Sequence, residues 1–161
     1  MKKIILTLIV IYSLFLLTAC PSPATIEKAK TNSKKIATIA NEGVNITREL
    51  YQSKIINASA AKSIADKFIV LAEGGIAFDA AVLRLEKAHG ASVPKSELEK
   101  LFSVFSTEVV QKFIDVLASL KILNVSESFK NTILLVQTAV ITIARAFDRG
   151  KQVKQRIEAV A

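Results

Sequence analysis

The stretch LEKLFSVFSTEVVQKFIDVLASL, residues 98–120, carries the clearest signal of how this chain folds. Apolar side chains recur along it at three- and four-residue steps, at Leu98, Leu101, Phe102, Phe105, Val109, Phe113, Val116, Leu117 and Leu120. This period places them on one face of an α-helix, with polar side chains on the other. The spacing therefore predicts a long amphipathic helix, which a Ser96–Glu99 capping box opens after Pro94.

Three further helices are predicted from the same period. Residues 26–50 carry one apolar stripe and predict a single long helix, with Gly43 as the point where it would otherwise break in two. A second predicted helix is capped near Asn57 and ends at His89 and Gly90. The last one starts at a Ser126 cap and carries apolar residues from Phe129 to Phe147.

The end of the chain combines an apolar segment with a basic tail. The segment TILLVQTAVITIA, residues 132–144, is apolar on nearly every face, which predicts that this helix is the most enclosed. Gln137 and Arg145 argue against a membrane span there. The tail RGKQVKQRIEAVA, residues 149–161, keeps the helical spacing. We favour a charged, solvated end over an extension of the last helix or a basic amphipathic piece.

No segment shows the two-residue alternation of β-strands with turn pairs between them. The predicted fold is all-α, an up-and-down bundle of about four helices that follows a cleaved N-terminal signal peptide. At 1.5 Å per residue, each helix should be about 35 to 45 Å long.

The N-terminal segment, residues 1–19, has the pattern of an export signal. Lys2 and Lys3 precede an uncharged run from Ile4 to Ala19, which falls short of a permanent membrane span. The run ends in Leu17-Thr18-Ala19-Cys20, which resembles the lipobox of bacterial lipoproteins. The resemblance implies a diacylglyceryl group on the Cys20 thiol and cleavage just before Cys20. In the less favoured alternative, Cys20 is an ordinary small residue of a signal peptide cleaved elsewhere.

The predicted organisation is a signal peptide at 1–19, the lipidated cysteine with a short tether at 20–24, and the helical bundle at 25–161. Cleavage before Cys20 leaves the segment 20–161, which is long enough for one domain with its own core. In Gram-negative lipoproteins an aspartate after the cysteine favours the inner membrane. Pro21 stands there, so the resemblance suggests the periplasmic face of the outer membrane, or in a Gram-positive cell the outer face of the cell membrane.

The formal net charge is +8, of which Lys2 and Lys3 supply two. A basic chain often binds nucleic acid. Export argues against that partner here, and so does the shortage of stacking side chains, since the chain has no Trp and keeps only Tyr51 after processing. Anionic lipid or an acidic envelope protein fits better. The predicted contacts are Lys28, Lys34 and Lys35 on the first helix, together with the basic C-terminal end.

The residue patterns predict no enzyme, cofactor or metal site. Glu86 and His89 form one Glu-x-x-His unit, but di-iron bundles need two such units plus two further glutamates, and the chain has no second histidine. Asp79, Asp115 and Arg145 lie between apolar neighbours. We favour a solvent-facing position for each over an inward pair such as Asp79 with Arg145, which would fix helix register.

Two functions remain open. The first is a non-enzymatic, lipid-anchored interaction or assembly module of the cell envelope. The second is a module that binds a lipid or other small apolar ligand in a groove between helices at Gly74 and Gly75, in LAEGGIAFDAA. The same two glycines also fit a kink or a close helix crossing, which is the interpretation we favour.

Overall fold

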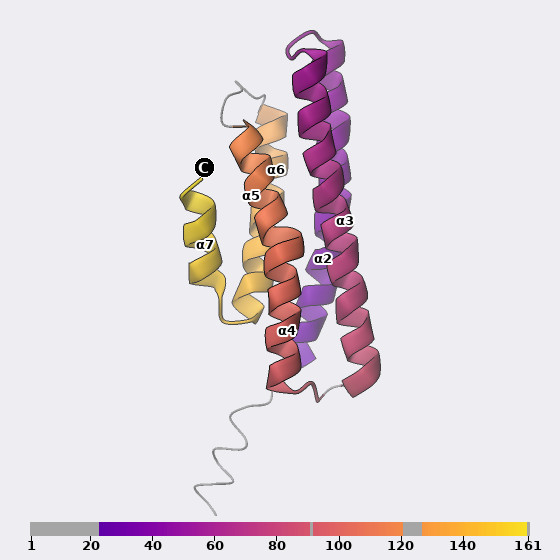
Figure 1. Ribbon diagram of the computed structural model, residues 1–161, viewed down its shortest axis with the longest axis vertical. Coiled ribbons are helices and arrows are strands. Elements are labelled where there is room, and N and C mark those ends of the chain that lie inside the picture. The colour runs from indigo at the N-terminus through magenta and orange to yellow at the C-terminus, as the bar shows by residue number, and fades with distance from the viewer. Residues whose placement is uncertain (1–22, 91, 121–126, 161) are drawn as a thin grey trace, which may run out of the picture.

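The computed structural model describes residues 23–90, 92–120 and 127–160, and within these ranges the chain is helical with no strand (Figure 1). The prediction of an all-α helical bundle is confirmed. Its elements are α2 (Pro23–Gln52), α3 (Ala58–His89), α4 (Lys95–Phe105), the π-helical turn η1 (Ser106–Gln111), α5 (Lys112–Leu120), α6 (Glu127–Ala146) and α7 (Gly150–Glu158). Cys20 and Ser126 lie outside the described residues.

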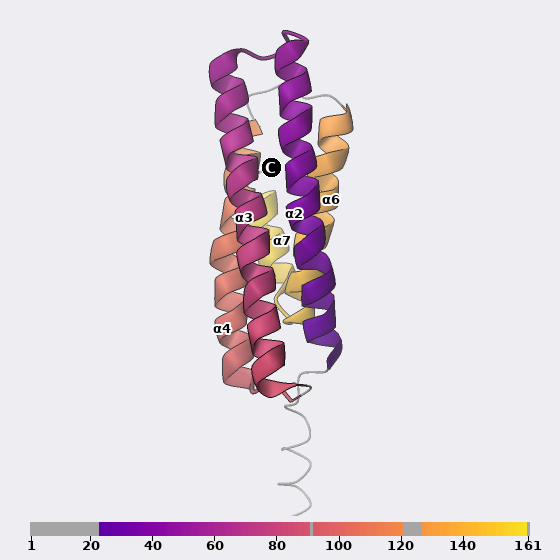
Figure 2. The same cartoon turned by 90° about the vertical axis from the view of Figure 1, so that its right-hand side faces the viewer.

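A long antiparallel pair of helices, α2 and α3, forms one side of the bundle (Figures 1 and 2). α2 continues through Gly43, so the prediction of one long helix is confirmed. Asn57 caps α3 as predicted, because its side-chain oxygen accepts a hydrogen bond from the backbone N–H of Ala60 at 2.9 Å. α3 ends at His89, where Gly90 takes a positive φ of 59° that L-residues with a side chain rarely adopt.

Gly43 lies inside α2 because the ring of Phe68 occupies the space where a side chain would stand. A Cβ atom at residue 43 would approach a ring carbon of Phe68 to 2.5 Å. Both residues are buried, so the absence of a side chain at residue 43 lets the aromatic ring pack directly on the backbone of α2. This glycine therefore serves packing between α2 and α3 rather than ending a helix.

The start of α4 differs from the predicted capping box. Pro94 is the N-cap residue, and its carbonyl accepts hydrogen bonds from the backbone N–H groups of Glu97 at 3.0 Å and Leu98 at 3.2 Å. Proline has a fixed φ, and its extended backbone (φ −60°, ψ 145°) directs the chain into the helix earlier than Ser96 would. No side chain caps this end, and Glu97 instead forms an ion pair with Lys100 at 2.7 Å. The capping-box prediction is wrong.

The stripe of residues 98–120 faces the core as predicted, with every member buried except Phe102, which is half-buried. α4, η1 and α5 follow one another directly as a single rod (Figure 1). The π-helical turn widens the buried face, so that the neighbours Val109 and Val110 are both fully buried. Sequence periodicity did not indicate this turn.

The core is built around aromatic side chains that join the helices in pairs. Phe68 of α3 meets Phe129 of α6 edge to face, with ring centroids 5.6 Å apart. Phe78 of α3 packs on Phe105 of α4 at 5.0 Å. Such ring pairs add about 0.5–1.5 kcal/mol each to the stabilisation from burial alone. α3 is therefore the helix that ties the two sides of the bundle together.

The prediction that the fourth helix, α6, would be the most enclosed is wrong. Leu134 and Leu135 are 57% and 54% exposed, while Val136, Val140 and Ile143 are buried. The described contacts of α6 are chiefly with α2 and α7, so its outer face stays open. None of the helices in the described ranges is both long and apolar enough to cross a membrane.

The basic tail forms a helix that packs back on the bundle, which contradicts the prediction of a charged, solvated end. Asp148 takes a positive φ of 58° between α6 and α7, and α7 then buries Val153 and Ile157. The guanidinium of Arg156 donates hydrogen bonds to Ser106 Oγ and Gln111 Oε1, both at 3.0 Å. α7 is thus an amphipathic helix that packs on the bundle, and its Arg156 side chain donates hydrogen bonds to the first and last residues of η1.

Truncation of Ile157 should show that α7 contributes to stability. Ile157→Ala removes a fully buried side chain, so we expect the free energy of unfolding to fall by about 2–3 kcal/mol. Lys151→Ala, at an exposed position of the same helix, should change it by less than about 0.5 kcal/mol. Urea unfolding followed by circular dichroism measures both. Equal effects of the two substitutions would mean that α7 does not pack on the bundle.

Candidate functional site

The three lysines predicted to contact a partner are all exposed on α2. Lys28 and Lys35 lie seven residues apart and hence on one side of the helix, with Lys34 next to Lys35. Within the described part of the chain, none of their ammonium groups has an ion-pair partner. These three cations are therefore available to an outside anion.

Lys30, on the same helix, has a structural role instead. Its ammonium group donates to Glu86 of α3 at 3.0 Å, and this hydrogen bond and the charge of Glu86 raise the pKa of Lys30 above its ordinary value. The pair ties the first half of α2 to the last turn of α3. Because Glu86 is engaged with Lys30, the Glu86 and His89 unit does not present a free pair of ligands, and no cluster of three metal-binding side chains occurs among the described residues.

The basic C-terminal end, predicted as a second contact region, is largely used inside the molecule. Arg156 binds η1, as described above. Arg149 lies 5.9 Å from the ring centroid of Phe102 and 3.5 Å from a carboxylate oxygen of Glu99. Lys154 lies 3.4 Å from Glu158 within α7. The free positive charge of this end is therefore smaller than the sequence indicates.

Gly74 and Gly75 lie at close helix crossings, the interpretation favoured from the sequence. A Cβ atom at residue 74 would collide with the backbone carbonyl oxygen of Glu108 in η1. One at residue 75 would lie 3.2 Å from the backbone nitrogen of Ala37 and 3.3 Å from the carbonyl oxygen of Ser33, both in α2. Backbone of α2 and η1 thus occupies the space beside the two glycines, which leaves no groove at this point.

The three charged residues with apolar neighbours do not form the inward pair considered above. Asp79 is half-buried and accepts a hydrogen bond from the fully buried hydroxyl of Ser33 at 2.8 Å, which helps to fix the register of α3 against α2. Asp115 and Arg145 are exposed, as expected, and Asp115 accepts a hydrogen bond from the amide of Gln111 at 3.1 Å. Asp79 is therefore structural rather than solvent-facing.

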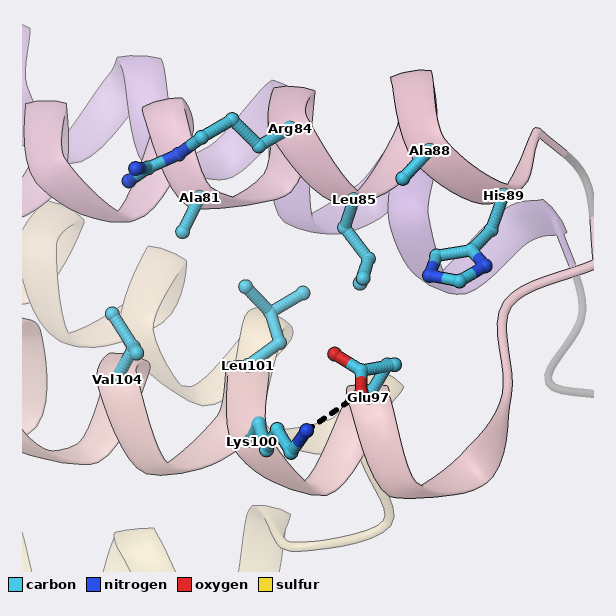
Figure 3. A pocket seen from close by; sticks show the side chains of 9 residues that line it. All are labelled: Ala81, Arg84, Leu85, Ala88, His89, Glu97, Lys100, Leu101 and Val104. Atoms are coloured by element: carbon cyan, nitrogen blue, oxygen red, sulfur yellow. Dashed lines mark hydrogen bonds and ion pairs between the residues drawn. The ribbon is translucent and has the colours of Figure 1, made fainter.

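A groove that the sequence did not indicate lies between the last turns of α3 and the first turns of α4 (Figure 3). Its volume is about 280 Å³. Apolar side chains line it from both helices, and charged or polar ones stand beside them. The lining residues are Ala81, Arg84, Leu85, Ala88, His89, Glu97, Lys100, Leu101 and Val104. The small residues Ala81 and Ala88, seven apart on α3, are the one sequence signal that could have pointed to it.

The size and charge of this groove limit what it can hold. Its volume is just below the roughly 300–1,000 Å³ of sites that enclose a small molecule. It therefore suits part of a ligand, such as one side chain of a partner or a segment of an acyl chain. The hydrogen bond from Lys100 lowers the pKa of Glu97 below its ordinary value, and the charge of Lys100 acts in the same direction. Glu97 and Lys100 thus neutralise each other, which leaves Arg84 as the cation at the groove.

Sequence and structure comparisons supply no relative from which a role could be transferred. The chain matches no family model, no curated protein and no solved structure.

Proposed function

We propose that this chain is a lipid-anchored, non-enzymatic interaction module of the bacterial cell envelope, held to a membrane through Cys20. The observation that carries the proposal is the lipobox-like Leu17-Thr18-Ala19-Cys20, which stands just ahead of Pro23, where the first described helix of the bundle begins. Among the described residues, the buried core of that bundle extends from Ile26 to Ile157.

The position of the anchor suggests which surfaces meet the membrane. The start of α2, the end of α3 and the start of α4 lie at the same end of the bundle (Figures 1 and 2). Lys28 lies about 8 Å along α2 from Pro23, whereas Lys34 and Lys35 lie about 17 Å along it. Exposed charges interact over a Debye length of about 8 Å at physiological salt. In an upright bundle Lys28 is therefore suited to anionic head groups, and Lys34 and Lys35 to an acidic protein.

The anchor is tested by substitution of its cysteine in the full chain, expressed in a bacterial host. We expect the parent protein in the membrane fraction and in the detergent-rich phase after phase separation, because two acyl chains hold a protein stably to a bilayer. Cys20→Ser should fail to incorporate labelled palmitate, whereas the parent chain and Ser22→Ala, two residues on, should incorporate it. Equal labelling of all three chains would exclude a lipid anchor at Cys20.

The contact lysines are tested by capture of partners from envelopes treated with a cross-linker. The triple variant Lys28→Gln, Lys34→Gln, Lys35→Gln should lose the cross-linked products. A matched triple at exposed lysines elsewhere, Lys62→Gln, Lys95→Gln, Lys151→Gln, should retain them. Capture by the parent chain should also weaken as ionic strength rises, because salt screens exposed charges. If neither salt nor the substitution of Lys28, Lys34 and Lys35 changes the cross-linked products, these lysines do not bind the partner.

The second candidate, a module that binds a lipid or small apolar ligand, is favoured only by the groove between α3 and α4. Native mass spectrometry of the full chain released from membranes in mild detergent tests it. A reproducible extra mass that Ala88→Leu abolishes would support ligand binding, because leucine at residue 88 would fill the groove. Its absence from the parent chain, or its persistence in Ala88→Leu, would exclude the groove as the site.

A further inference from the structure

The outer face of α3 carries a straight row of exposed apolar side chains. Ile69, Ile76 and Leu83 are seven residues apart, and their exposed fractions are 43%, 60% and 40%. The row extends over about 21 Å at 1.5 Å per residue. Exposed Ala80 lies beside it, so another backbone could approach closely. A seven-residue apolar spacing is the pattern with which one helix packs along another.

The charges next to this row change sign along the helix. Asp66 and Glu73 lie in its first half, and Arg84 and Lys87 in its second half. All four are exposed, and none forms an ion pair with another described residue. The charges on this face of α3 are therefore complementary to those on an identical face that lies antiparallel to it.

We propose that the outer face of α3 binds the same face of a second copy of this chain, with the two helices antiparallel. A two-fold axis near Ile76 would place Ile76 against its counterpart and Ile69 against Leu83 of the second copy. Asp66 would then lie opposite Lys87 of the second copy at each end of the pair. An isologous contact of this kind closes after two copies and does not propagate.

The charge pattern favours a second copy of this chain as the partner, and it favours the antiparallel orientation of the two α3 helices. A parallel pair would bring Asp66 to Asp66, Glu73 to Glu73 and Lys87 to Lys87, and like charges in register oppose association. An anionic membrane surface would be repelled by Asp66 and Glu73 on the same face. Lys62, the remaining exposed cation near the row, would lie opposite Gly90 of the second copy, at the outer end of the contact. The contact uses residues of α3 alone, so the proposed pairing does not depend on whether Cys20 carries a lipid.

Cysteine cross-linking of the full chain in isolated membranes tests the geometry. Ile76→Cys should give dimers with a short bismaleimide, whereas Ile69→Cys and Leu83→Cys alone should not. A mixture of the Ile69→Cys and Leu83→Cys chains should again give dimers. The parent chain, whose one cysteine is Cys20, measures the background. Self-linking at all three positions would mean a parallel pair, and no linking above background would mean that α3 does not pair, so either result overturns the proposal.

Charge reversal gives a second test that leaves the fold intact, because the altered residues are exposed. Lys87→Glu should reduce the dimer yield of Ile76→Cys by about fivefold, since it places like charges at both ends of the pair. Adding Asp66→Lys to Lys87→Glu should restore the yield, because opposite charges then face each other again. A yield that the single reversal leaves unchanged, or that the second reversal fails to restore, would contradict antiparallel pairing.

Discussion

Alanine at Gly74 should lower the free energy of unfolding of the bundle by about 2–3 kcal/mol. The added Cβ collides with the carbonyl oxygen of Glu108, a backbone atom of η1 that cannot rotate away as a side chain would. α3 and the rod of α4, η1 and α5 must then separate, which loosens contacts along the whole rod. Alanine gains about 1 kcal/mol of helix propensity over glycine, and the expected loss is what remains after that gain.

Gly75→Ala is the matched control, one residue along the same helix. Its Cβ would lie 3.2 Å from the nearest backbone atom, a tight contact that a small shift of α2 relieves. The strain and the gain in helix propensity should nearly cancel, so stability should stay within about 1 kcal/mol of the parent. Urea unfolding of the two variants compares them directly. If Gly74→Ala proves as stable as Gly75→Ala, the close approach of α3 to η1 is wrong.

Phe68→Ala should cause the largest loss of stability, about 3–5 kcal/mol. The ring is fully buried, packs edge to face on Phe129 and lies against the backbone of Gly43. Its removal leaves a cavity where α2, α3 and α6 meet, and the surrounding helices close such a space only in part. Tyr51→Ala, at an exposed aromatic residue, should cost less than about 0.5 kcal/mol.

The contact between Phe68 and Gly43 makes this prediction more specific. Gly43→Ala alone should destabilise the protein, because its Cβ would press on the Phe68 ring. In the Phe68→Ala background the same substitution should be neutral or stabilising, since the ring is gone and alanine favours the helix. A double-mutant cycle should therefore give a coupling of about 1–3 kcal/mol, whereas additive effects would mean that the two residues are not in contact.

Residues 98–120 show why the fold class was predictable from the sequence. The helical period of their apolar side chains depends only on local spacing, and the same period was present in α2, α3 and α6. The cap at Asn57 also follows from local chemistry, because its side chain reaches a backbone N–H three residues away. At the start of α4 two local signals competed. The fixed φ of Pro94 prevailed over the side-chain cap expected near Ser96.

Features that depend on distant segments could not be predicted. The apolar faces of α6 indicate a helix that tolerates burial, but the number of neighbours that cover it is set by the whole bundle, and Leu134 and Leu135 remain exposed. The path of the tail depends on the backbone turn at Asp148, which places Ile157 against the core. The sequence favours a kink or a helix crossing at Gly74 over a groove, but only the position of Glu108 shows which segment approaches it.

The candidate contact surfaces likewise include features that the sequence predicts and features that depend on distant segments. The exposure of Lys28, Lys34 and Lys35 follows from their place on the polar face of α2, so the sequence predicted it correctly. Lys30, between them, is paired with Glu86 across 56 residues of sequence, which no local pattern indicates. The groove between α3 and α4 likewise needs two helices brought together at a turn. Which cations are free is therefore a property of the fold rather than of the composition.

The proposed function depends above all on Cys20 being the first residue of the mature protein and carrying a lipid. The intact mass of the full-length chain, after expression in a bacterial host and recovery from its membranes, measures both properties at once. We expect a chain that begins at Cys20 and carries the added mass of a diacylglyceryl group, with a further acyl group where the host adds one. A mass equal to the unprocessed chain, or to a chain cleaved elsewhere with Cys20 unmodified, would contradict the proposal.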